Sequence, residues 1–310
     1  MPFLESFACL WCGTTYTTRT ADDLEGWAQL CPDCVGKAGD NGFLRFRLRQ
    51  ALAERAAAAK PATVQPGVSQ QPVGVAVGGG RQEPDDVDGS MIEYYEARAP
   101  EYDDWYLRRG RYERGAIHDS AWNAELDAAG RWLDALPWGG EIVELAAGTG
   151  WWSPLLASRG ELSLYDTSAA ALDRARERLV AHGLRAHLHV RDAWAEPDRK
   201  VDGLFLGFWL SHVSRDRLPD FLALAHRWLK PGGRVAFIDS LADPASGAVD
   251  HPAPADDRAV RRLDDGREFT IVKVYHEPAG LSAALRAAAF DDVEVSTTGR
   301  FFVLGSATAR

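Results

Sequence analysis

The sequence lacks cysteine beyond residue 34, and it lacks both a long apolar run and a basic leader segment. Without further cysteines, disulfides cannot hold the remainder of the 310-residue chain together. No uninterrupted apolar run approaches the roughly 18 residues that a membrane span needs, and no basic-then-apolar leader opens the chain. We therefore expect a soluble, cytoplasmic protein with no membrane partner.

Basic residues are also in deficit, since the formal net charge is −10 at pH 7. Residues 1–90 hold 8 Lys and Arg against 11 Asp and Glu, and residues 91–310 hold 27 against 34. Proteins that neutralise nucleic-acid phosphates usually carry an excess of Lys and Arg on the binding domain. Nucleic acid is therefore not an expected partner.

A hydrophobic share of 46% allows a sizeable core, and one Pro/Gly-rich break divides the chain unequally. Residues 60–90 contain several prolines and glycines and show no helical period, which predicts a flexible linker. The predicted organisation is a small module with a following helix at residues 1–59, the linker at 60–90, and one full-sized domain at 91–310.

The four cysteines form two matched pairs, Cys9 with Cys12 and Cys31 with Cys34. Thiolates at this C-x2-C spacing can close a tetrahedral Zn²⁺ site, and a segment this short has little other means of holding a fold. Two disulfides or a redox CxxC pair are the alternatives, and the expected cytosolic location disfavours them. We predict a zinc-ribbon-like module with a structural zinc, which could dock a protein partner but has no open position for catalysis.

Residues 91–310 alternate apolar, strand-like runs with helical patterns, which predicts a parallel sheet covered by helices. Only a short turn separates the last two apolar runs, and this spacing forces an antiparallel hairpin. The expected strands lie near residues 141–146, 161–165, 186–190, 201–206, 234–239, 292–296 and 301–305. Ser214 is expected to cap the helix that runs to Leu229.

The run from Glu141 to Gly150 leads from a buried strand into a glycine-bearing turn and then a helix. Gly148 and Gly150 let a ligand approach the backbone where a β-carbon would obstruct it, and free N–H groups at the helix start suit an anionic group. An acid, Asp166, ends the next apolar run. Together these features predict a site for a nucleotide-like cofactor.

The order of these features resembles the class I S-adenosylmethionine (SAM)-dependent methyltransferases. The resemblance rests on seven strands with a terminal hairpin, an acid in the first strand, another after the second, and Leu-Lys-Pro-Gly-Gly before the fifth. Within that class, Tyr94–Tyr106 and Gly207–Val213 are similar to segments of small-molecule methyltransferases related to the quinone C-methyltransferases. The resemblance covers residues 91–310 and implies a Rossmann-like sheet. A dehydrogenase is the weaker alternative, because the loop lacks the third glycine of G-x-G-x-x-G.

This resemblance implies that each matching residue helps to hold SAM. Glu144 would bind the methionine ammonium directly or through water, and Asp166 would accept from both ribose hydroxyls. The segment after the third strand would meet adenine, and tyrosines of the helical cap would touch the cofactor carboxylate or line the acceptor pocket. The implied cofactor-binding residues are Tyr95, Tyr102, Glu144, Ala146, Gly148, Gly150, Asp166, Thr167, Asp192, Ala193, Trp194 and Gly207.

Some of these residues have an alternative interpretation. Ala146 stands where the family usually has glycine, which is tolerable if the backbone there has φ below zero. Trp194 would cover the adenine ring, but core packing is the alternative for a large aromatic side chain. Tyr95 and Tyr102 have the same alternative, since they could pack the cap helices onto the sheet. Trp151, directly after the glycine loop, could likewise face the pocket or pack in the core.

Methyl transfer needs a base only if the acceptor loses a proton. His212 follows the strand end that would face the cofactor methyl group, and the unperturbed pKa of a histidine lies near neutrality. It is therefore the candidate general base, with a hydrogen-bonded structural histidine as the alternative. His118 and Asp239 are weaker candidates.

Residues 241–278 form a long excursion between the fifth strand and the last helix. Phe269, Ile271, Lys273 and Tyr275 share one parity, which predicts an added strand. Elements beyond the strand ends usually set acceptor specificity, so we expect this excursion to form a wall of the acceptor pocket.

These features together predict SAM-dependent methyl transfer to a small-molecule acceptor, in specialised metabolism. A second hypothesis is an rRNA or protein methyltransferase that uses the zinc module for docking, although the acidic balance disfavours an rRNA substrate. A third is a non-catalytic adaptor that binds SAM without turnover.

Overall fold

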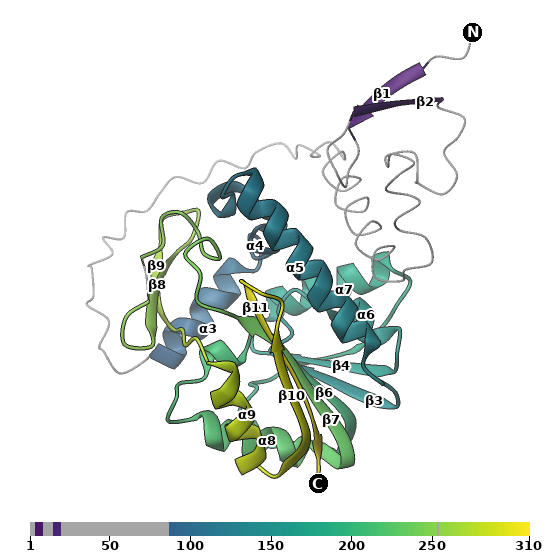
Figure 1. Ribbon diagram of the computed structural model, residues 1–310, viewed down its shortest axis with the longest axis vertical. Helices are drawn as coiled ribbons and strands as arrows, with labels where there is room; N and C mark the ends of the chain where they lie inside the picture. The colour runs from purple at the N-terminus through teal and green to yellow at the C-terminus, as the bar shows by residue number, and fades with distance from the viewer. Residues whose placement is uncertain (1–3, 9–14, 20–86, 253) are drawn as a thin grey trace, which may run out of the picture. The chain divides into compact units, whose positions relative to one another are not determined.

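A computed structural model of the chain describes residues 4–8, 15–19, 87–252 and 254–310 (Figure 1). The chain divides into two compact units, Met1–Asp86 and Val87–Arg310. In the first unit, β1 (Leu4–Ala8) and β2 (Thr15–Arg19) pair as an antiparallel ladder that the sequence analysis does not predict.

The predicted zinc ligands Cys9, Cys12, Cys31 and Cys34 lie outside the described residues, so the zinc site stays a prediction. Within the described ranges, no group of three or more His, Cys, Asp or Glu side chains is placed to hold a metal ion. Most of the predicted linker also lies outside them. Helix α3 (Val87–Arg98) takes in residues 87–90, which the sequence analysis assigns to the linker.

The second unit is built on a seven-stranded sheet in the order β10-β11-β7-β6-β3-β4-β5. Strand β11 alone runs antiparallel to its neighbours, while the other pairs are parallel. The predicted Rossmann-like sheet with an antiparallel C-terminal hairpin is therefore confirmed. The strands are β3 (Glu141–Leu145), β4 (Glu161–Asp166), β5 (His187–Val190), β6 (Val201–Gly207), β7 (Leu229–Ser240), β10 (Phe290–Thr297) and β11 (Phe302–Ala309).

Helices cover both faces of this sheet (Figure 1). One face carries α5 (Ala116–Ala135), α6 (Ser153–Ala157) and α7 (Ala169–Ala181), and the other carries α8 (Leu218–Trp228) and α9 (Pro278–Ala287). Strand alternation explains the division of β3, because every second side chain of a strand points to the same face. Val143 and Leu145 enter the core beneath α8 and α9, so Glu144 points to the opposite face.

Helix α8 begins later than the sequence pattern predicts. Its first residue is Leu218, and Arg217 occupies the N-cap position without a side-chain cap. The predicted cap residue, Ser214, instead accepts the backbone N–H groups of Arg217 and Leu218 on its carbonyl oxygen. Pro219 explains the later start, since proline fits the first turn of a helix, where its missing N–H has no intrahelical partner.

A small cap is added to this frame. Helix α3 packs against an antiparallel pair formed by β8 (Arg258–Arg262) and β9 (Glu268–Val272). Strand β9 is the predicted added strand, whereas β8 was missed because Arg-Ala-Val-Arg-Arg has no alternation of apolar and polar residues. The cap has its own apolar core, made by Met91, Tyr94, Ala259, Leu263, Phe269 and Ile271.

In the described part of the chain, no helix combines the length and apolarity that crossing a membrane requires.

Candidate active site

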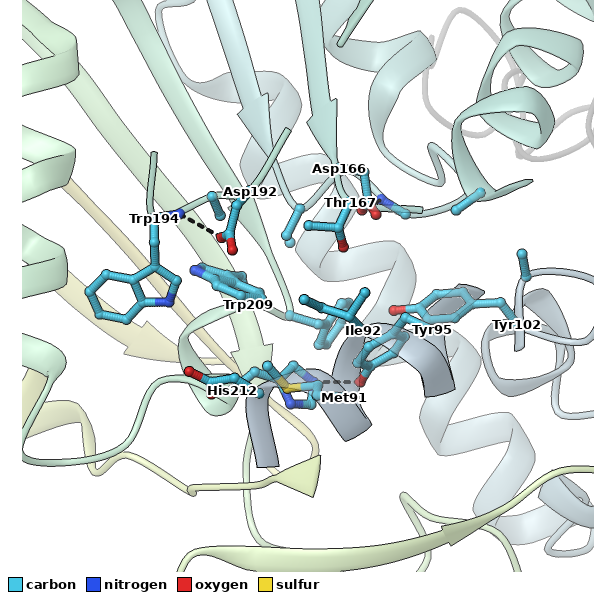
Figure 2. Close-up of a pocket in the computed structure, with 18 residues that line it drawn as sticks. Met91, Ile92, Tyr95, Tyr102, Asp166, Thr167, Asp192, Trp194, Trp209 and His212 are labelled. Carbon is cyan, nitrogen blue, oxygen red and sulfur yellow. Dashed lines mark hydrogen bonds between the residues drawn. The ribbon is translucent and has the colours of Figure 1, made fainter. Parts of the chain in front are cut away.

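A pocket lies at the carboxyl ends of the parallel strands β3, β4, β5 and β6, with α3 as its opposite wall (Figure 2). About 830 Å³ of empty space lies within it, part of which is open to solvent. Ligands of open α/β sheets bind at this edge. The predicted site residues that line it are Tyr95, Tyr102, Ala146, Gly148, Asp166, Thr167, Asp192, Ala193, Trp194, Gly207 and His212.

The loop after β3 has a left-handed backbone at three alternate positions. Ala146, Gly148 and Gly150 have φ values of 50°, 55° and 70°. The φ of Ala146 is positive, so the condition that would make alanine tolerable there is not met, and this alanine is strained by roughly 1–2 kcal/mol. At Gly148 an added β-carbon would meet only Tyr102, whose Cζ is 4.0 Å away, so this glycine leaves the backbone open to the pocket.

Asp166 is the last residue of β4, and its side chain is 9% exposed. Its Oδ2 accepts the N–H of Gly148 at 2.7 Å, and its Oδ1 accepts the N–H of Ser168 at 2.8 Å. Burial raises the pKa of Asp166 to about 6, although these two bonds oppose the rise. A carboxylate has about four lone-pair positions, so each oxygen can still accept a second bond from a ligand.

The segment after β5 lies on the same side of the pocket as Asp166 (Figure 2). Asp192 accepts the N–H of Trp194 on Oδ1 at 2.8 Å, which leaves Oδ2 for a ligand. The Trp194 ring packs edge-on against Phe221 and carries Arg217 at 4.1 Å over its face. Trp194 therefore packs on the core and also lines the pocket, and its contact with adenine stays a prediction.

Glu144 and Gly150 are the two predicted site residues that do not line this pocket. Strand alternation turns the Glu144 side chain away from it, and its Oε2 accepts the Ser153 hydroxyl at 2.6 Å. Burial raises the pKa of Glu144 to about 8. Gly150 has a packing role, since a β-carbon there would lie 2.7 Å from Cβ of Ala175 on α7.

Tyr95 and His212 connect the cap to the end of β6. The Tyr95 hydroxyl lies 2.7 Å from Nε2 of His212, and the other ring nitrogen, Nδ1, lies 2.7 Å from the carbonyl oxygen of Val272. Burial, followed by repulsion from Lys273, holds the pKa of His212 well below its usual range. The candidate base is thus half-buried, neutral and already hydrogen-bonded to a pocket tyrosine.

Gly207 ends β6, and its lack of a side chain makes room for Trp152, whose Cδ1 would lie 3.0 Å from an added β-carbon. The next residue, Phe208, has a φ of 58°, which is unusual for a bulky side chain. Its N–H donates to the Ile238 carbonyl oxygen at 2.7 Å. Strain of this kind persists where neighbouring structure imposes it and is frequent at functional sites.

A polar clamp ties the glycine loop to the cap. The Thr149 hydroxyl donates to Asp103 of α4 (Asp103–Leu107) at 2.6 Å. Arg178 of α7 pairs with the same carboxylate and donates from Nε to the Thr149 carbonyl oxygen at 3.0 Å. The clamp fixes the loop backbone beside Gly148. Sequence reasoning missed it, because its three members come from separate elements.

The structure also adds pocket residues that sequence reasoning did not assign. Met91 and Tyr95 are spaced four residues apart and so share one face of α3, and Ala99 follows the end of the helix at the same spacing. That spacing was the available signal in the sequence. The additional lining residues are Asp88, Met91, Ile92, Ala99, Ala171 and Trp209.

The remaining candidates lie elsewhere. Trp151 is 2% exposed and stacks on Tyr106, with ring centroids 4.1 Å apart, so it is a core residue. His118 accepts a bond from Arg300 on Nδ1, and Asp239 accepts the backbone N–H groups of Ser211 and Ser240. Neither side chain lines the pocket.

A second pocket adjoins the first, and Tyr95, Tyr102, Phe208 and His212 line both. It encloses about 530 Å³ of empty space, part of it open to solvent. The predicted excursion at residues 241–278 supplies much of its wall. These residues are Ser246, Gly247, His251, Arg261, Ile271, Lys273 and Tyr275.

Comparisons with known proteins agree with this fold. The model of a methyltransferase-domain family, Methyltransf_25, matches residues 142–233. The ubiquinone/menaquinone biosynthesis C-methyltransferase UbiE of Coxiella burnetii (strain Dugway 5J108-111) is 34% identical over 109 residues, which are 33% of this chain and 43% of the relative. The chain therefore matches less than half the length of this curated relative.

Two solved structures match over a greater length. DhpI in complex with SAH (S-adenosylhomocysteine, the demethylated form of SAM) is 30% identical, with a TM-score of 0.56. The match covers 71% of this chain and 96% of DhpI. The DhpI–SAM–HEP complex is 29% identical, with a TM-score of 0.57, and the match covers 73% and 99% of the two chains. The chain belongs to the class I SAM-dependent methyltransferases.

Proposed function

We propose that this protein transfers the methyl group of SAM to a small-molecule acceptor. The observation that carries the proposal is the convergence of Asp166, Asp192 and the Gly148 backbone on one pocket at the carboxyl edge of the sheet. Membership of the SAM-dependent methyltransferases identifies SAM as the methyl donor. The acidic side chains also suit SAM, which carries positive charge on its sulfonium and ammonium groups.

The residues of the pocket fit the parts of this donor. Asp166 retains lone pairs for two ribose hydroxyls, and Asp192 with Trp194 offers an acceptor and an aromatic face for adenine. The open backbone at Gly148 leaves room for the methionine portion. Glu144 would act only indirectly, because its carboxyl group is buried behind the loop.

When bound, SAM would supply a sulfonium methyl carbon for in-line attack by an acceptor lone pair, with the electron pair of the broken C–S bond remaining on the sulfur of the departing thioether. The protein aligns the acceptor and excludes water. Tyr95 and His212 stand between the two pockets. If the acceptor loses a proton, the Tyr95 oxygen would receive it while the Tyr95 hydroxyl proton passes to Nε2 of His212.

The second pocket is the proposed acceptor site, because it meets the first at these residues and is walled by the excursion at residues 241–278. UbiE is a C-methyltransferase of quinone biosynthesis, which supports a small-molecule acceptor. Specialised metabolism remains the proposed setting. The zinc module remains proposed as a docking element for a protein partner.

The experiment that tests this function is incubation of the full chain with methyl-labelled SAM and an unfractionated extract of the producing organism, which contains its metabolites, proteins and RNA. The expected result is a labelled metabolite whose identity names the acceptor atom. The matched control is the same incubation with an Asp192→Ala variant, in which the proposed donor site is weakened. Label found only in protein or rRNA would contradict the proposal.

A further inference from the structure

The two adjoining pockets differ in charge. The described residues that line the SAM pocket include three aspartates and neither arginine nor lysine. Those that line the second pocket include Arg98, Arg261 and Lys273, with neither aspartate nor glutamate. The first pocket therefore suits a cation, whereas the second suits an anion.

Arg98 is the most buried of the three cations, with only 8% of the residue exposed. It ends α3 and lies among aromatic rings, with its guanidinium carbon 4.5 Å from the Tyr102 ring centroid. One terminal nitrogen donates to the Tyr112 hydroxyl at 3.1 Å, and Nε has no hydrogen-bond partner among the described residues. No carboxylate of the described residues forms an ion pair with Arg98. A buried charge without a counter-ion is unfavourable, so an anionic ligand would stabilise it.

Arg261 lies on β8 and also forms no ion pair with a described residue. Its terminal nitrogen donates to the carbonyl oxygen of Val260 at 3.1 Å, a neutral acceptor. Its guanidinium and that of Arg98 help to lower the pKa of His251 to about 4, after the larger effect of burial. The two arginines therefore add positive charge to the pocket, which the smaller effect of Asp250 opposes at His251.

Lys273 follows β9 and has partial compensation. Its Nζ donates to the hydroxyl groups of Ser211 at 2.9 Å and Ser240 at 3.2 Å. Asp239 accepts the backbone N–H groups of the same two serines, so one carboxylate lies close to this ammonium. Burial and the two arginines nevertheless lower the pKa of Lys273 to about 8. Asp239 thus offsets part of the charge of Lys273, whereas Arg98 and Arg261 form no ion pair with a described residue.

We propose that the second pocket binds the methyl acceptor through an oxyanion, a carboxylate or a phosphate-type group, held by Arg98, Arg261 and Lys273. The inference rests on the proposed function, because it makes this anion part of the molecule that is methylated. The guanidinium fork matches both kinds of oxyanion, and such charge-assisted bonds are the stronger ones in proteins. An acceptor anchored at the cations would reach the SAM pocket past Tyr95 and Phe208, which line both cavities.

The carboxylate of SAM itself is the competing occupant of these cations. None of the three cations lines the SAM pocket, which disfavours that assignment. An experiment in the presence of bound SAH separates the two, because an anion that belongs to the cofactor site would compete with SAH.

The test uses the full chain saturated with SAH and follows inorganic phosphate, acetate and acetamide by ligand-observed NMR at constant ionic strength. We expect phosphate or acetate to bind without displacing SAH, and acetamide, the neutral match of acetate, not to bind. The stronger of the two anions identifies the phosphate-type or carboxylate class. Arg261→Gln should lower the affinity for the anion by about tenfold, which is the effect of losing one charge-assisted hydrogen bond.

The matched control is Arg262→Gln, a neighbouring charge change on β8 whose side chain pairs with Glu268 and does not line the pocket. Anion affinity should stay within about twofold of the parent protein there. Equal loss in both variants, equal binding of acetamide, or displacement of SAH would overturn the inference. If the chain bound no SAH at all, the proposed function would fail, and the same titration without SAH would still report on the pocket.

Discussion

The Tyr95 hydroxyl oxygen lies 2.7 Å from Nε2 of His212, whose Nδ1 lies 2.7 Å from the carbonyl oxygen of Val272. A carbonyl oxygen can only accept, so Nδ1 carries the ring proton and Nε2 accepts the proton of Tyr95. This fixes the tautomer of the candidate base. It also means that His212 reaches an acceptor only through Tyr95.

We predict that nitrogen NMR of His212 shows a neutral ring protonated on Nδ1 from about pH 6 to 8, because its pKa is lowered by burial and by Lys273. The unfolded chain takes up the proton near pH 6.5, so this histidine costs stability as the pH falls below that value. His212→Gln should therefore reduce the acid sensitivity of the melting temperature. A ring that titrates near pH 6.5, or one protonated on Nε2, would contradict the assignment.

Ala146 predicts an uncommon stability effect, because its φ of 50° favours glycine. Ala146→Gly relieves strain of about 1–2 kcal/mol in the folded state. The greater conformational entropy of glycine also stabilises the unfolded state by about 0.4–1 kcal/mol, which opposes this gain. Denaturant unfolding should show an unchanged or higher free energy of unfolding. Ala147→Gly, one residue along and outside the left-handed region, should lower it by about 1 kcal/mol. Equal losses in the two variants would refute strain at Ala146.

The two loop glycines should separate binding from packing. Gly150→Ala places a β-carbon 2.7 Å from Ala175 with φ at 70°, and should cost about 3 kcal/mol of stability. Gly148→Ala meets no protein atom nearer than 4.0 Å, so its stability cost should be about 1 kcal/mol. The added methyl group enters the pocket and should lower the affinity for SAM by about tenfold or more. Calorimetry that shows full SAM affinity for Gly148→Ala would exclude contact at this loop.

Glu144 predicts a pH dependence of stability. Burial raises its pKa to about 8, so the folded chain retains a proton that the unfolded chain releases near pH 4.5. Stability from this group is present below pH 4.5 and is lost as the pH rises toward 8. Glu144→Gln should remove the loss, giving a variant more stable than the parent at pH 8 by an amount on the order of 4 kcal/mol. Parallel stability curves for the two proteins would show that the carboxyl group is ionised at neutral pH.

The main parts of the sheet and its ligand edge could be predicted because they depend on local patterns. Apolar runs separated by helical segments predict the strands. Asp166 is the last residue of β4 and Asp192 lies just after β5, so both mark strand ends. Glu144 shows the limit of that reasoning. The family pattern marks its position, but strand alternation turns its side chain to the face away from the pocket.

The cationic lining of the second pocket could not be predicted from local sequence. Arg98, Arg261 and Lys273 come from α3, β8 and the segment after β9, and a surface position explains each one equally well. Only the packing of the cap brings them together. Strand β8 was missed for a related reason, since Ala259 is the one fully buried residue in a strand that is otherwise charged or exposed.

The most direct test of the SAM assignment is calorimetric titration of SAM into the parent protein, Asp166→Asn and Asp173→Asn. The last variant removes an exposed carboxylate on α7 that pairs with Arg176 and lies outside the pocket. We predict that the parent and Asp173→Asn bind SAM equally, and that Asp166→Asn binds about 10- to 100-fold more weakly through loss of charge-assisted ribose bonds. Absence of binding to the parent, or undiminished affinity in a folded Asp166→Asn protein, would contradict the account.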